Sequence, residues 1–130
     1  MRDLPLYAGI AVCGSLGAIT RFAVSSWASQ WPNFPYGTLI VNVIGCFLLG
    51  ALAYSPLTDL TFVTPQMRTA VGTGFLGALT TFSTFGVETF DRIEKNEWHL
   101  AGLNIAANIA LGLLAVWLGR VVIQSCLATS

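Results

Sequence analysis

The segment GFLGALTTFSTFG, residues 74–86, contains the residue types in this chain that are best suited to chemistry. Hydroxyl side chains and aromatic rings are interleaved there, at Thr80, Thr81, Ser83 and Thr84 and at Phe75, Phe82 and Phe85. Hydroxyl groups can donate hydrogen bonds to an anion, and the positive edge of an aromatic ring can face one. Phe82 and Phe85 are three residues apart and would share a helix face. The segment is therefore either an anion-binding stretch or ordinary packing in which each hydroxyl bonds to a carbonyl one turn earlier.

Glycines precede the hydroxyl cluster, at Gly72, Gly74 and Gly77. Each glycine disfavours a helix by about 1 kcal/mol relative to alanine, so these glycines followed by Thr-Thr predict a helix break. A broken helix exposes carbonyls at one half-end, which suit a cation, and amides at the other, which suit an anion. The string GTGFLG, residues 72–77, also matches the dinucleotide pattern GxGxxG. It lies in an apolar helical run without a preceding strand, so it is not expected to bind a nucleotide.

Two pairs of polar side chains lie within otherwise apolar stretches. Thr38 and Asn42 are four residues apart, as are Asn104 and Asn108, so each pair would lie on one helix face. The asparagines would either tie helices together or line a polar track. Thr38 and Asn42, opposite a broken helix rich in hydroxyls, favour the polar track.

Two charged residues stand close to the ends of apolar stretches. A carboxylate within a span, such as Glu88, is a functional candidate, although near a charged loop it is equally well explained as interfacial. Arg21 would either extend to the lipid headgroups or raise the local concentration of anions at a vestibule. The sequence has no HExxH, P-loop, nucleophile elbow or Cys/His cluster, so an enzyme is not expected.

The elements that must position these residues follow from the composition. The 130 residues are 55% hydrophobic and 9% charged, with a mean hydropathy of +0.72, whereas a soluble domain carries about 25% charged residues. Spanning a bilayer takes about 20 apolar residues. The sequence predicts one all-α membrane domain over residues 1–130, with its third helix broken. The four expected spans are Leu4–Ser26, Gly37–Tyr54, Met67–Phe90 and Leu100–Ile123. The zero formal net charge gives no basis for nucleic-acid binding.

The positive charges are balanced between the two expected sides of the membrane. One side would hold Arg2, Arg68 and Arg120, and the other Arg21, Arg92 and Lys95. This balance gives the positive-inside rule nothing to act on. We therefore expect insertion in both orientations and pairing of inverted copies as an antiparallel, dual-topology homodimer. The alternative is a single orientation that is fixed by another feature.

Three segments together resemble the Fluc (CrcB) family of small fluoride channels, and the resemblance extends over all four spans. They are GSLGAITRF (14–22), YGTLIVNVIGCFLLG (36–50) and TGFLGALTTFSTFGVE (73–88). The resemblance implies a dual-topology antiparallel homodimer with two fluoride pores and a structural Na⁺ at the dimer centre. It also implies a multi-pass protein of the bacterial inner (plasma) membrane that exports cytoplasmic fluoride by passive electrodiffusion and so lowers its toxicity.

The resemblance further implies roles for individual residues. The backbone carbonyls of Gly77 and Thr80 would bind the sodium ion at the break. Phe82 and Phe85 would present ring edges to fluoride, and Asn42 would donate to the ion from its amide. The remaining pathway residues would be Arg21 at the vestibule and Thr38, Ser83, Thr84, Glu88 and Asn108 along the track.

The fourth helix departs from the family pattern, because the family often has a hydroxyl or histidine in the track there. This chain has Asn108, followed a turn later by Gly112. The alternative function is a small dual-topology, proton-coupled exporter of the multidrug type, which needs a central carboxylate. The first helix has no acid, and Glu88 is off-centre. A non-conducting membrane subunit is a third class.

Overall fold

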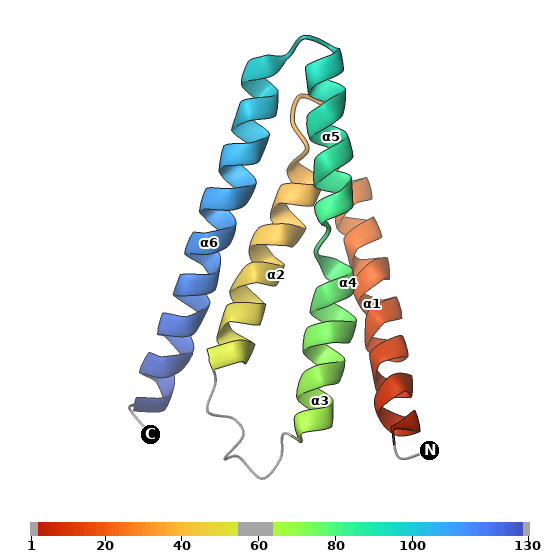
Figure 1. Cartoon of the computed structure of the whole chain (residues 1–130), viewed down its shortest axis with the longest axis vertical. Helices are drawn as coiled ribbons and strands as arrows, with labels where there is room; N and C mark the ends of the chain where they lie inside the picture. The colour runs from red at the N-terminus through yellow and green to blue at the C-terminus, as the bar shows by residue number, and fades with distance from the viewer. Residues whose placement is uncertain (1–2, 55–63, 129–130) are drawn as a thin grey trace.

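The computed structural model describes residues 3–54 and 64–128. Within these residues, four helices are long and apolar enough to cross a membrane, as the sequence predicts (Figure 1). They are α1 (Leu4–Ala28), α2 (Tyr36–Tyr54), a segmented third span over Pro65–Glu94, and α6 (Trp98–Ala128). The protein is therefore a multi-pass, all-α membrane protein.

The third span consists of four segments, because its helix changes geometry and then breaks. It begins with α3 (Pro65–Thr69), continues as the π-helical turn η2 (Ala70–Leu76) and ends its first half with α4 (Gly77–Leu79). Thr80 and Thr81 are extended, with φ/ψ of −78°/152° and −149°/114°. The second half is α5 (Phe82–Glu94), which Figure 1 shows joined to α4 by a short extended link.

The break is present as predicted, but the glycines do not form it. Gly72 and Gly74 lie within the π-helical turn, and Gly77 has helical φ and ψ of −65° and −31°. The chain leaves the helix only at Thr80. Gly74 instead allows the close approach of α1, because a Cβ on it would lie 2.7 Å from the carbonyl oxygen of Ile10. The expectation that glycine propensity causes the break is therefore wrong at these positions.

Glycines in the other helices allow close helix packing, which the small-residue pattern of membrane helices predicts. A Cβ on Gly17 of α1 would lie 2.2 Å from the carbonyl oxygen of Phe75, and one on Gly119 of α6 would lie 2.1 Å from that of Phe47. Gly102 is different, since nothing lies within 4 Å of its built Cβ. Close backbone approach therefore joins α1 to η2 and α2 to α6.

The ends of the helices carry identifiable signals. Thr64 caps α3 by accepting a hydrogen bond from the backbone N–H of Met67 at 3.2 Å. Asn96, with a φ of 60°, turns the chain between α5 and α6. Near the loop between α1 and α2, the rings of Trp27 and Trp31 meet edge to face at 4.7 Å. Aromatic residues of this kind are typical of the membrane interface.

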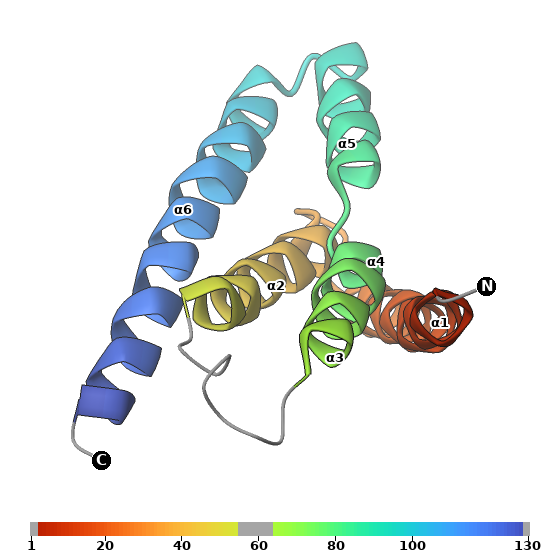
Figure 2. The same cartoon turned by 60° about the horizontal axis from the view of Figure 1, so that its bottom comes forward.

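The two described chain ends lie at the same end of the molecule, and the α5–α6 turn lies at the other end (Figure 1). Turning the view shows that α5 and the adjoining end of α6 lie away from α1 (Figure 2), whereas the rest of α6 stays packed against α2. At the end that holds the termini, the Arg120 guanidinium lies 4.7 Å from the centre of the Tyr54 ring. Nearby, Arg68 donates hydrogen bonds to the carbonyl oxygens of Leu52 and Ala53. Four crossings with both ends on one side agree with the predicted topology.

Few large apolar side chains are buried in the single chain. The buried cluster consists of Val41, Leu76 and Leu79. Bulky residues such as Phe22 and Leu113 are 73% and 69% exposed. Lipid tails would cover such surface, as would a second copy of the chain. The expected antiparallel homodimer stays a prediction.

Candidate functional site

Asn42 of α2 completes the backbone hydrogen bonding at the helix break. Its Oδ1 accepts a hydrogen bond from the Thr81 N–H at 2.8 Å, and its Nδ2 donates to the Thr81 carbonyl oxygen at 3.3 Å. In an unbroken helix the Thr81 N–H would bond to the carbonyl of Gly77. The Asn42 amide therefore replaces that helical bond, and the Gly77 carbonyl loses its helical donor.

Thr81 also starts the second half of the span. Its Oγ1 accepts from the Thr84 N–H at 3.2 Å and donates to Thr84 Oγ1 at 3.0 Å, and its distance to Ser83 Oγ is 3.4 Å. This is the N-cap arrangement that threonine favours. Thr80 Oγ1 donates back to the carbonyl of Leu76 at 3.1 Å. The hydroxyls of this segment therefore hydrogen-bond locally and stabilise the break.

A hollow of about 270 Å³ opens beside the break. Polar groups from three helices meet aromatic rings around it. Its lining comprises Asn42, Gly45, Cys46, Leu49, Thr80, Thr81, Phe82, Phe85, Asn108 and Ile109. The Phe82 and Phe85 ring centroids are 5.4 Å apart with a 50° angle between the planes, and Phe82 is 83% exposed. A large, exposed aromatic side chain thus lies at an open, largely apolar hollow that a few polar groups enter.

A second hollow of about 270 Å³ lies between α5 and the loop that joins α1 to α2. Thr38 Oγ1 donates to Glu88 Oε1 at 2.7 Å, and both residues line this hollow. The other carboxylate oxygen, Glu88 Oε2, is buried without a hydrogen-bond partner among the described residues. Thr38 and Glu88 are therefore in direct contact at this hollow, and their place in a polar track stays a prediction.

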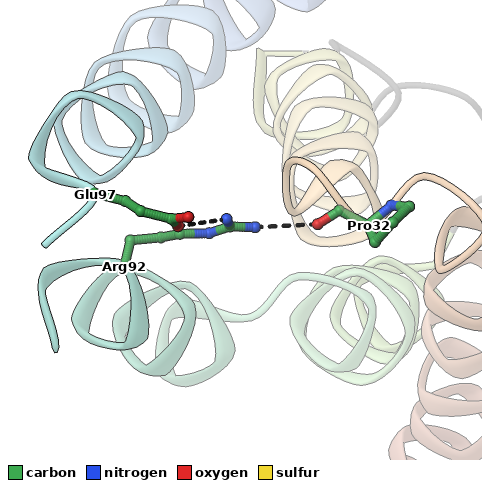
Figure 3. Close-up of polar contacts among 3 residues, drawn as sticks. All are labelled: Pro32, Arg92 and Glu97. Carbon is green, nitrogen blue, oxygen red and sulfur yellow. Dashed lines mark hydrogen bonds and ion pairs between the residues drawn. The ribbon is translucent and has the colours of Figure 1, made fainter. Parts of the chain in front are cut away.

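Arg92 also lines the second hollow, and its side chain contacts both the α1–α2 loop and the turn between α5 and α6. Its Nη1 contacts Glu97 Oε2 at 2.7 Å, and its Nη2 donates to the carbonyl oxygen of Pro32 at 3.2 Å (Figure 3). The backbone N–H of Glu97 also donates to the Arg92 carbonyl at 2.8 Å. The hydrogen bond from the Arg92 guanidinium holds the pKa of the Glu97 carboxyl below its ordinary value. The Glu97 carboxylate therefore keeps its charge at neutral pH.

Three asparagine side chains link α2, α5 and α6. Asn42 Nδ2 donates to Asn108 Oδ1, Asn108 Nδ2 donates to Asn104 Oδ1, and Asn104 Nδ2 donates to Thr89 Oγ1, each at 2.9 Å. Thr89 Oγ1 in turn donates to the Phe85 carbonyl at 2.7 Å. Asn104 is fully buried. Asn104 therefore connects helices through hydrogen bonds. Asn108 takes part in the same chain of hydrogen bonds and also lines the hollow at the break.

The other predicted site residues line neither of the two hollows. Ser83 and Thr84 are exposed and lie beside Thr81, but they do not line the hollow at the break. Arg21 is half-buried on α1 and lines neither hollow. Gly77 is exposed at the break. Gly112 is buried, and a Cβ built on it would lie 3.6 Å from Cys46 Sγ.

Two residues near these hollows had no role in the prediction. Thr89 was part of no pattern, although it lies one turn beyond Phe85 on the face that meets α6. Arg92 was counted only among the loop charges. A signal did exist for it, because a glutamate follows it five residues later in a short turn.

The family model of the CrcB-like proteins, described as Camphor Resistance (CrcB), matches residues 8–120. A curated relative from Acidobacterium capsulatum is 45% identical over 118 residues, which cover 89% of this chain and 94% of that protein. Another, from Shewanella frigidimarina, is 43% identical with the same coverage of both chains. Both relatives are named fluoride-specific ion channel FluC. The chain therefore belongs to the CrcB family.

Proposed function

We propose that this protein is a fluoride-selective channel that exports cytoplasmic fluoride passively across the bacterial inner membrane. The observation that carries the proposal is the hollow at the helix break, where the Asn42 amide and the rings of Phe82 and Phe85 meet. The names of the relatives identify the ion. The side chains at the break supply dipoles without a charged group, which suits an anion that must enter and leave quickly.

Fluoride gives up its hydration shell only where other hydrogen-bond donors replace the water. Asn42 Nδ2 is such a donor, and its bond to the Thr81 carbonyl is long, at 3.3 Å. This bond is the weakest that the amide makes, so its proton is the one that Asn42 can redirect to an ion. The positive edges of Phe82 and Phe85 add favourable potential beside it. In a site of low dielectric constant these weak donors act more strongly than in water.

The remaining pathway residues extend this route on both sides of the break. Asn108 lines the same hollow as Asn42, and Thr38 and Glu88 line the hollow farther along α5. In the proposed pathway Ser83 and Thr84 face the ion from the start of α5, and Arg21 attracts anions at the vestibule. These last three roles need a surface that a second chain completes.

An antiparallel homodimer would complete that surface. Phe82, Ser83, Thr84 and Gly86 are exposed at the start of α5, where only Phe85 among these residues is half-buried, and Gly77 is exposed on α4. Polar and small residues exposed at the middle of a span are tolerated in a membrane only against protein or water. This exposed face therefore supports pairing with an inverted copy, which the balanced charges permit.

The backbone at the break fits a structural sodium ion. Asn42 takes the Thr81 N–H that would otherwise bond to the Gly77 carbonyl, and Thr80 is extended rather than helical. Carbonyls released by an unwound span are suitable Na⁺ ligands in membrane proteins. Gly77 and Thr80 would bind the ion through these oxygens, and the bound Na⁺ would supply a fixed positive charge at the dimer centre.

The test is fluoride release from liposomes that contain the purified protein, recorded with a fluoride electrode and with chloride release as the control. We expect fluoride efflux that needs only an electrical shunt for the counter-charge, and much slower chloride efflux. Tight liposomes would refute the proposal. Efflux that required a pH gradient, or transport of organic cations, would instead indicate the multidrug-type exporter.

A further inference from the structure

The hollow that contains Thr38 and Glu88 has one cationic side chain in its lining, Arg92. A positive charge beside an anion pathway raises the local concentration of the anion. This charge does not act alone, because the Glu97 carboxylate lies 2.7 Å from the Arg92 guanidinium. Glu97 itself does not line the hollow and belongs to the turn between α5 and α6.

The turn is built to bring Glu97 back to Arg92. Asn96 adopts a left-handed backbone conformation, with a φ of 60°, and the Glu97 N–H donates to the Arg92 carbonyl at 2.8 Å. A non-glycine residue accepts this conformation at some cost, and asparagine accepts it best. Arg92 is held on its other side by the carbonyl of Pro32 at 3.2 Å (Figure 3). The guanidinium is thus fixed at the hollow, and the Glu97 carboxylate, which lies outside the lining, partly neutralises its charge.

We propose that Glu97 masks the charge of Arg92 and thereby limits the rate at which fluoride enters the hollow. This inference rests on the proposed channel function. The Arg92 side chain is 17% exposed and that of Glu97 is 36% exposed, so the pair lies at the edge of the hollow in contact with water. Glu88 supplies the carboxylate of the lining itself. Removing the charge of Glu97 would leave Glu88 as the one carboxylate in this lining opposite Arg92, so the potential at the hollow would become more positive.

The Glu97→Gln variant isolates the charge from the geometry. A glutamine oxygen can still accept from Arg92, and the bond to the Pro32 carbonyl does not involve residue 97. We expect initial fluoride efflux at about 10 mM salt, where the Debye length is about 30 Å, to increase. The increase is about twofold to fourfold for a unit charge roughly 10 Å from the ion path. At about 1 M salt, with a Debye length of about 3 Å, the increase should disappear.

Neutralising Arg92, alone and together with Glu97, provides the matched controls. Arg92→Gln removes the cation and leaves Glu97 unmasked, so efflux at low salt should fall by a similar factor. The double variant Arg92→Gln with Glu97→Gln restores the balance of charge, so its efflux should return close to that of the wild type. A purely structural clasp predicts the opposite pattern, with loss in both single variants and greater loss in the double variant. Glu94→Gln, an exposed change on the same helix, should raise efflux less than Glu97→Gln.

Each outcome of these experiments either supports or overturns the proposed masking role of Glu97. Unchanged or lower efflux of Glu97→Gln at low salt, while the wild type conducts, would overturn the masking role and leave the proposed channel function intact. An equal increase in Glu94→Gln would also overturn it, since net charge alone would then be sufficient. If Glu97→Gln does not give a folded channel, the pair is structural and masking is wrong. A wild type that releases no fluoride removes the proposed function itself.

Discussion

Replacing Asn42 with aspartate changes one NH₂ group at the helix break into an oxygen and keeps the shape of the side chain. The carboxylate can still accept from the Thr81 N–H, which lies 2.8 Å from Asn42 Oδ1. The two donor bonds, to the Thr81 carbonyl at 3.3 Å and to Asn108 Oδ1 at 2.9 Å, are lost. Both become contacts between oxygen atoms, and the hollow on the proposed fluoride pathway gains a negative charge.

The negative charge that Asn42→Asp introduces determines how far fluoride efflux should fall. Two like charges about 4 Å apart repel by about 4 kcal/mol at an effective dielectric constant of about 20. Since 1.4 kcal/mol corresponds to a tenfold change in an equilibrium constant, this repulsion lowers ion occupancy by about 1,000-fold. The half-buried position of Asn42 lets water screen part of it. We therefore expect fluoride efflux to fall on the order of 100-fold, with a smaller loss of stability, about 1–3 kcal/mol, from the two lost bonds.

The assay is fluoride release from liposomes at neutral pH, with the same amount of protein incorporated for each variant. Asn33→Asp is the matched control, because it adds the same charge at an exposed position of the loop between α1 and α2. Size-exclusion chromatography in detergent shows whether Asn42→Asp keeps the oligomeric state of the wild type. If a folded Asn42→Asp channel conducts within twofold of the wild type, Asn42 does not contact the ion and the reasoning is refuted.

Three further predictions concern the rings, the helix packing and the ion pair. Phe82→Ile or Phe85→Ile should abolish fluoride efflux without changing the oligomeric state of the protein, because bulk is kept while the ring edge is lost; unchanged efflux in both variants would show that the rings do not contact the ion. Gly119→Ala should lower the melting temperature of the detergent-solubilised protein through an overpacking cost of about 1–3 kcal/mol, whereas Gly102→Ala should leave it unchanged, as its built Cβ meets nothing within 4 Å. The pKa of Glu97 is lowered by its arginine partner, so its stabilising effect is present above its unfolded pKa of about 4.3 and is lost as the pH falls below that value. Melting curves of Glu97→Gln between pH 7 and pH 3 should lack this component, and parallel pH profiles for variant and wild type would contradict it.

The spans could be predicted from the sequence because hydropathy and length are local properties. The third span extends over Pro65–Glu94 where Met67–Phe90 was expected, and α6 begins at Trp98 rather than Leu100. These differences lie at helix ends, whose positions are determined by caps and turns rather than by hydropathy. Thr64, for example, caps α3 outside the apolar window.

The exact position of the break could not be predicted from propensity. Glycine disfavours an isolated helix, but the neighbouring α1 approaches Gly74 so closely that the helical turns are held by packing. The break occurs at Thr80 and Thr81, and Asn42, 39 positions away in the chain, supplies substitute hydrogen bonds to Thr81. No pattern within the segment itself encodes that partner. The spacing of Thr38 and Asn42 did predict a polar face, because the pair shares one side of a single helix.

The dependence of the break on one amide limits how tightly an ion can bind there. Asn42 stabilises the Thr81 backbone and, in the proposed pathway, also donates to fluoride. An ion that took both Nδ2 protons would leave the Thr81 carbonyl and Asn108 Oδ1 without donors, at about 1–3 kcal/mol for each buried group. The long bond of 3.3 Å is the one that can be exchanged at low cost. Binding at this site is thus held weak by the same hydrogen bonds that maintain the break, and weak binding is what rapid release of the ion requires.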